Sequence, residues 1–116
     1  MNEVKETAIA LRNEILRSKE ITTQADISDV FISAEFIISS LAFLIGPIAD
    51  MEQAYRKLIA EGIKDGSHAK AEAMAKASDE YKEWRKYVGL YELGHEQVML
   101  LKKFRDDLQR EYQRSS

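Results

Sequence analysis

The chain has one proline and five glycines among its 116 residues, and this scarcity of turn-forming residues limits the folds open to it. Barrels and sandwiches join many short strands by turns rich in these two residues. Hydrophobic residues make up 45% of the chain and charged residues 32%, a balance typical of folded rather than disordered chains. The sequence therefore predicts one all-α domain over residues 1–116.

Hydrophobic spacing predicts a first helix over residues 3–20. Val4, Ala8, Leu11 and Ile15 are separated by four, three and four residues, which places them on one helical stripe. Thr23 can cap a second helix, which we expect to begin near residue 24.

The second helix is expected to end or kink at Gly46 and Pro47, because proline donates no backbone hydrogen bond and clashes with the preceding turn. Pro47 equally suits the first turn of a third helix, which should continue as far as Glu61. Gly62 is then placed to adopt the left-handed conformation just past the helix end, with a turn over residues 64–67.

Residues 67–114 contain nothing that forces a break, so we expect one helix roughly 70 Å long there. Gly89 and Gly94 each cost about 1 kcal/mol relative to alanine, and a break would fall between them. The hydrophobic residues follow the alternating steps of a coiled coil at Ala77, Tyr81, Trp84, Val88, Tyr91, His95 and Val98. The predicted fold is a long antiparallel helical hairpin with an extra N-terminal helix, a three- to four-helix bundle with a coiled-coil-like C-terminal helix.

Residues 30–48 form the most apolar stretch of the chain, and its apolar surface is wider than one helical stripe. We expect this surface to pack against protein, both within the chain and in a homo-oligomer, with a symmetric dimer favoured. The candidate self-association residues are Val30, Phe31, Phe36, Ile37, Leu41, Phe43, Leu44, Trp84 and Tyr91.

The same stretch has about the length of a membrane span, so a small membrane protein is an alternative. Glu35 within the stretch is costly in lipid, and acidic rather than basic residues bracket it at Asp26, Asp29, Asp50 and Glu52. Because of these acidic residues we expect no membrane association.

A metal site is a further alternative. Glu92 and His95 have the E-x-x-H spacing found in di-metal carboxylate bundles, and Glu35 in a two-fold dimer could supply the remaining carboxylates. His95 equally suits a hydrogen-bonded position on the helix, so we expect no metal and no cofactor.

Basic residues near the aromatic residues of the last helix suggest a nucleic-acid-binding alternative. The net charge of −3 gives no overall attraction to phosphates, and acidic neighbours dilute the local field. The candidate residues are Lys82, Arg85, Lys86, Lys102, Lys103 and Arg105.

The sequence contains no cysteine and none of the nucleophile, phosphate-loop or zinc-protease motifs, so we expect no enzymatic activity. Its first residues are acidic where a secretion signal would be basic, which favours a cytoplasmic location.

Residues 55–58 (YRKL), 70–76 (KAEAMAK), 80–82 (EYK) and 100–103 (LLKK) resemble small all-helical accessory proteins of phages and prophages. The resemblance implies an intracellular helical protein that binds other macromolecules. The function expected from the sequence is therefore a self-associating protein-interaction or scaffold module.

Overall fold

The computed structural model describes residues 2–21 and 27–115, and these residues form four helices and no strand. The helices are α1 (Asn2–Ser18), α2 (Ile27–Ile63), α3 (His68–Lys76) and α4 (Asp79–Ser115). The molecule is elongated, with extents of 71 × 27 × 19 Å. The all-α prediction is confirmed.

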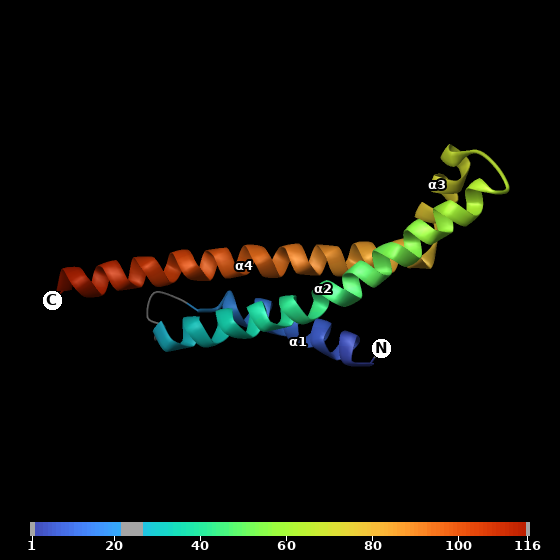
Figure 1. Ribbon diagram of the computed structural model, residues 1–116. Coiled ribbons are helices and arrows are strands. Elements are labelled where there is room, and N and C mark those ends of the chain that lie inside the picture. Colours follow the sequence, from blue (N-terminus) through green and yellow to red (C-terminus); the bar gives the residue numbers. More distant parts are fainter. Residues whose placement is uncertain (1, 22–26, 116) are drawn as a thin grey trace.

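The two 37-residue helices α2 and α4 lie side by side and antiparallel (Figure 1). Helix α1 packs along the N-terminal half of α2, and α3 lies at the opposite end of the molecule, where α2 ends and α4 begins. The C-terminal end of α4 extends past the start of α2. This arrangement is the predicted hairpin with an added N-terminal helix.

Helix α2 continues through Pro47, so of the two predicted alternatives the end of the helix is wrong, whereas the change of direction in the middle of α2 is consistent with a kink (Figure 1). A proline disfavours helical geometry in the preceding residue partly through that residue's Cβ. Gly46 has no Cβ, which removes this clash. Packing of residues on both sides of the proline, such as Leu44 and Tyr55, then holds the two halves in one helix.

The predicted continuous helix over residues 67–114 is divided between Lys76 and Asp79 rather than near Gly89 or Gly94. The Ser78 hydroxyl accepts a hydrogen bond from the backbone N–H of Tyr81 at 3.2 Å, which is the interaction of a helix N-cap. Acidic residues follow directly at the start of α4, where the helix dipole favours negative charge.

Gly62 lies within α2, and no described residue has a positive φ, so the predicted left-handed conformation at Gly62 is wrong. The glycine instead permits a close approach of two helices. A Cβ at Gly62 would lie 2.9 Å from the Cβ of Ala71 on α3. The predicted cap at Thr23 lies outside the described residues.

The core lies between α1, α2 and α4, and it consists of Leu11, Ile15, Val30, Ile37, Leu41, Leu44, Tyr87, Val98 and Leu101. Gly94 brings α4 close to α2, since a Cβ there would lie 2.8 Å from Cδ2 of Leu41. Gln97 of α4 donates a buried hydrogen bond of 2.9 Å to the Ser18 hydroxyl of α1. Together with the core contacts, this hydrogen bond fixes α1 against α4 and leaves the opposite side of α2 uncovered.

Candidate interaction surfaces

Helix α2 carries exposed large hydrophobic residues along both edges of the side that α1 and α4 leave uncovered; Phe36 and Phe43 border α1, and Phe31 borders α4. We define the α2 face as these six side chains, which are 44–61% exposed: Phe31, Ile32, Phe36, Ile38, Phe43 and Ile45. With a turn of 100° per residue they form two rows, one at seven-residue spacing through positions 31, 38 and 45 and another through 32, 36 and 43. Glu35, Ser39 and Ala42 lie between the rows and are also exposed. The two rows are therefore about 140° apart around the helix, and each extends along three to four turns with a more polar strip between them.

The structure divides the candidate self-association residues into two groups. Phe31, Phe36 and Phe43 belong to the α2 face, and Trp84 and Tyr91 are half-buried on α4. The other four are packed inside the chain's own core and are not available to a second copy: Val30, Ile37, Leu41 and Leu44. Ile32, Ile38 and Ile45 also belong to the exposed surface, which the sequence did not predict. Spacing gives no signal for them, because the buried residues Val30, Ile37 and Leu44 have the same seven-residue spacing.

Helix α2 is also long and apolar enough to cross a membrane, by length and composition alone. Its most apolar 18-residue window has a mean hydropathy of 1.9, and 28% of that window is buried within the molecule. Mostly buried core helices of soluble proteins, and signal sequences near an N-terminus, pass the same test. Glu35 lies in the middle of the α2 face, where lipid contact would be costly for a carboxylate.

The N-terminal part of α2 carries only negative charge. Residues 27–51 include the exposed carboxylates of Asp29, Glu35 and Asp50 and contain no lysine, arginine or histidine. The α2 face is therefore flanked by acidic groups of its own helix, while Arg105 of α4, which pairs with Asp106, lies over the ring of Phe31.

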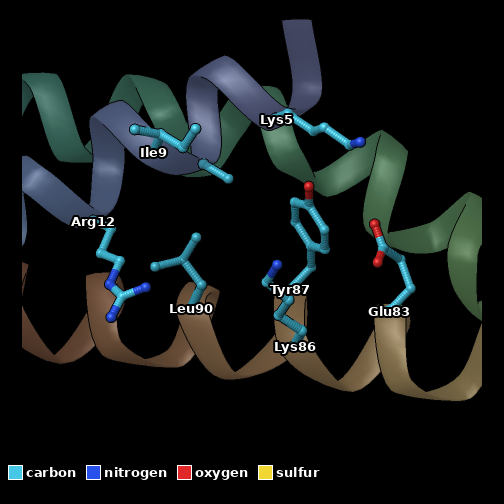
Figure 2. A pocket seen from close by; sticks show the side chains of 8 residues that line it. Lys5, Ile9, Arg12, Glu83, Lys86, Tyr87 and Leu90 are labelled. Carbon is cyan, nitrogen blue, oxygen red and sulfur yellow. The ribbon is translucent and has the colours of Figure 1, made fainter. Parts of the chain in front are cut away.

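A groove of about 380 Å³ lies between α1 and α4, and Figure 2 shows the two helices on either side of it. It contains three basic side chains, Lys5, Arg12 and Lys86, and one acidic side chain, Glu83. None of the three basic groups forms an ion pair with any residue of the described ranges. We define the α1/α4 groove by its lining residues, Lys5, Ala8, Ile9, Arg12, Glu83, Lys86, Tyr87 and Leu90.

Burial of the Tyr87 side chain, and to a smaller extent the nearby charge of Glu83, raises the pKa of the Tyr87 hydroxyl. The tyrosine is therefore neutral at physiological pH, and the groove keeps its excess of positive charge. Ile9, which is 61% exposed, lies at the α1 edge of the groove. Leu93, 53% exposed, follows Lys86 by seven residues and continues the same side of α4.

The six candidate nucleic-acid-binding residues do not form one basic patch. Lys86 and Lys102 are separated by sixteen residues, or about 24 Å along α4, and by about 160° around it. Arg105 lies over the ring of Phe31 at 5.5 Å and pairs with Asp106 at 3.1 Å. The remaining members are all exposed: Lys82, Arg85 and Lys103.

The aromatic residues near the start of α4 pack against α2. Trp84 stacks on Tyr55 with ring centroids 5.3 Å apart, and Tyr81 contacts both rings. The guanidinium carbon of Arg85 lies 5.7 Å from the centroid of the Trp84 ring. Trp84 is therefore engaged by other side chains of the protein, which leaves it little surface on which a base could stack.

The candidate metal ligands do not form a site within one chain. Glu35 is exposed on α2, and Glu92 and His95 are exposed on α4. In the described part of the chain, no group of three or more His, Cys, Asp or Glu side chains is placed to hold a metal ion.

Comparisons of the chain with protein-family models, with curated protein sequences and with solved structures each return no match. The features of the molecule that indicate a function are its two exposed surfaces, the α2 face and the α1/α4 groove.

Proposed function

We propose that this protein is a self-associating helical interaction module, in which the α2 face makes contact with other copies of the chain. The observation that supports this most strongly is the exposure of six large hydrophobic side chains in two rows along α2. Monomeric soluble proteins rarely expose contiguous apolar patches of more than a few hundred Å², and larger patches mark interaction sites.

Self-association is expected to be favourable because it removes the apolar side chains of the α2 face from water. Burial of apolar surface contributes roughly 25 cal/mol per Å², so each large side chain that becomes fully covered contributes on the order of 1 kcal/mol. Six such side chains supply several kcal/mol, part of which offsets the loss of translational and rotational freedom on association. A second copy is always present at the same concentration as the first, which makes self-association the simplest way to cover the α2 face.

A protein partner suits the α2 face better than lipid does, because Glu35 lies at its centre. A carboxylate at a protein interface can be paired with a cation, whereas in lipid it has no partner. The proposed location is the cytoplasm, and the proposed biological role is that of a scaffold, in keeping with the resemblance to phage accessory proteins. The nucleic-acid alternative has less support because the basic residues on α4 are dispersed.

The test compares two variants that place the same charge on two exposed hydrophobic positions. Ile45→Glu alters the α2 face, whereas Met74→Glu alters α3, outside both surfaces; the two parent side chains are 57% and 67% exposed. We expect light scattering to give a mass above that of one chain for the wild type and for Met74→Glu, and a lower mass for Ile45→Glu. Equal masses for both variants would contradict the proposal.

A further inference from the structure

We infer that the partner of the α2 face is the α1/α4 groove of a second copy, so that copies join head to tail. This inference rests on the proposed self-association and specifies its geometry. A two-fold dimer in which two α2 faces pack on each other is the competing arrangement.

Charge distinguishes the two arrangements. The α2 segment over residues 27–51 carries three carboxylates and no basic residue, whereas the groove carries Lys5, Arg12 and Lys86 against the single carboxylate of Glu83. Packing α2 on the groove brings opposite charges together and provides partners for the three cations. Packing α2 on a second α2 brings like charges together, including Glu35 at the centre of each face, and like charges at an interface are unfavourable.

The groove is shorter than the α2 face. At 1.5 Å per residue, the α2 face from Phe31 to Ile45 is about 21 Å long. The lining of the groove extends about 10 Å on α1, from Lys5 to Arg12, and about 10 Å on α4, from Glu83 to Leu90. The α2 face would therefore also cover residues beyond the groove, where Leu16 on α1 and Leu100 on α4 are exposed hydrophobic residues.

The two surfaces lie on opposite sides of the bundle. Every residue that lines the groove belongs to α1 or α4, and none belongs to α2 (Figure 2). Helices α1 and α4 both turn their core residues, such as Leu11 and Val98, toward the buried side of α2, and the two rows of the α2 face lie on either side of the uncovered stripe of that helix. Because the α2 face of one copy binds the α1/α4 groove of another, an assembly always has one free α2 face and one free groove at its ends, unless it closes into a ring. Such a heterologous contact builds rings or open chains instead of stopping at two copies.

The experiment uses two double variants, each of which blocks one surface. The α2-blocked variant carries Ile32→Glu and Ile45→Glu, and the groove-blocked variant carries Ile9→Glu and Leu93→Glu. All four parent side chains are more than half exposed, so the helical circular dichroism of both variants should match the wild type. Sedimentation velocity is then measured for each variant alone and for an equimolar mixture, with Met74→Glu as the matched control.

Head-to-tail association predicts that each blocked variant is monomeric alone, and that the mixture forms a 1:1 complex with twice the 13.3 kDa monomer mass and nothing larger. The wild type and Met74→Glu should form larger species. A groove-blocked variant that assembles as the wild type does, with only the α2-blocked variant monomeric, would overturn the inference and leave the proposed self-association intact. A monomeric wild type, or one that binds phosphatidylcholine vesicles while remaining monomeric in buffer, would overturn both.

Neutralisation of Glu35 gives an independent readout of opposite sign for the two arrangements. Glu35→Gln should weaken head-to-tail association by up to about fivefold, because a carboxylate that faces the basic groove is lost. The same substitution should strengthen an α2-on-α2 dimer, because it removes the repulsion between two carboxylates without introducing a new charge. A lower dissociation constant for Glu35→Gln would therefore overturn the inference.

Discussion

Substitution of Gly94 and Gly89 by alanine tests the close packing of α4 on α2. Both glycines lie within α4, and replacing a helical glycine by alanine stabilises a helix by about 1 kcal/mol. At Gly89 a Cβ would meet no atom within 4 Å, so Gly89→Ala should keep the whole gain. At Gly94 the Cβ would lie 2.8 Å from Cδ2 of the buried Leu41 and 3.6 Å from Cγ2 of the buried Ile37, and overpacking of this kind costs about 1–3 kcal/mol. Gly94→Ala should therefore range from neutral to about 2 kcal/mol less stable than the wild type.

The assay is urea denaturation followed by helical circular dichroism at one fixed protein concentration, since self-association makes apparent stability depend on concentration. The expected result is that Gly89→Ala exceeds Gly94→Ala by about 1–3 kcal/mol in the free energy of unfolding. If Gly94→Ala is stabilised as much as Gly89→Ala, the two helices do not approach closely at Gly94, and the packing that directs the α2 face outward is wrong.

Three further predictions concern single interactions within the fold. Gly62→Ala should range from neutral to about 2 kcal/mol less stable, because the helical gain of about 1 kcal/mol is opposed by an overpacking cost of about 1–3 kcal/mol: its Cβ would lie 2.9 Å from an alanine Cβ of α3 that cannot rotate away, and urea denaturation would measure the change. Ser18→Ala should cost about 1–3 kcal/mol in the same assay, since it leaves the buried amide of Gln97 without its acceptor. The ion pair with Arg17 lowers the pKa of Glu14, so its stabilising contribution is present at neutral pH and is lost as the pH falls below the ordinary glutamate pKa and through the lowered one. The stability difference between wild type and Glu14→Gln should therefore shrink between about pH 6 and about pH 3 in urea titrations, and a difference independent of pH would contradict this reading.

The helical class and the hairpin could be predicted because they depend on composition and on long hydrophobic periodicity. The positions of the helix breaks were harder to predict, because they depend on competition between local helix-ending signals and packing in the core. At Pro47 the rule that proline ends a helix is overridden by Gly46 and by core packing on both sides. The break before Asp79 does have a sequence signal, because a serine is followed there by two acidic residues, as at the start of a helix. The prediction considered hydrophobic periodicity and the lack of glycine or proline at this point, and it therefore missed the signal.

The orientation of α2 could not be predicted, because this helix is apolar on nearly every side. Val30 and Phe31 are adjacent in sequence and equally suited to a core, yet Val30 is buried and Phe31 is 46% exposed. Only the positions of α1 and α4 decide which stripe is covered. For the same reason the α1/α4 groove had no signal in the sequence, since its two walls are far apart along the chain.

Sedimentation equilibrium of the wild-type chain over a wide concentration range tests most directly whether the α2 face is covered by another copy. We predict that the weight-average mass exceeds the 13.3 kDa of one chain and rises with concentration. A mass that stays at 13.3 kDa up to about 1 mM would limit any self-association to less than about 4 kcal/mol and would contradict the account.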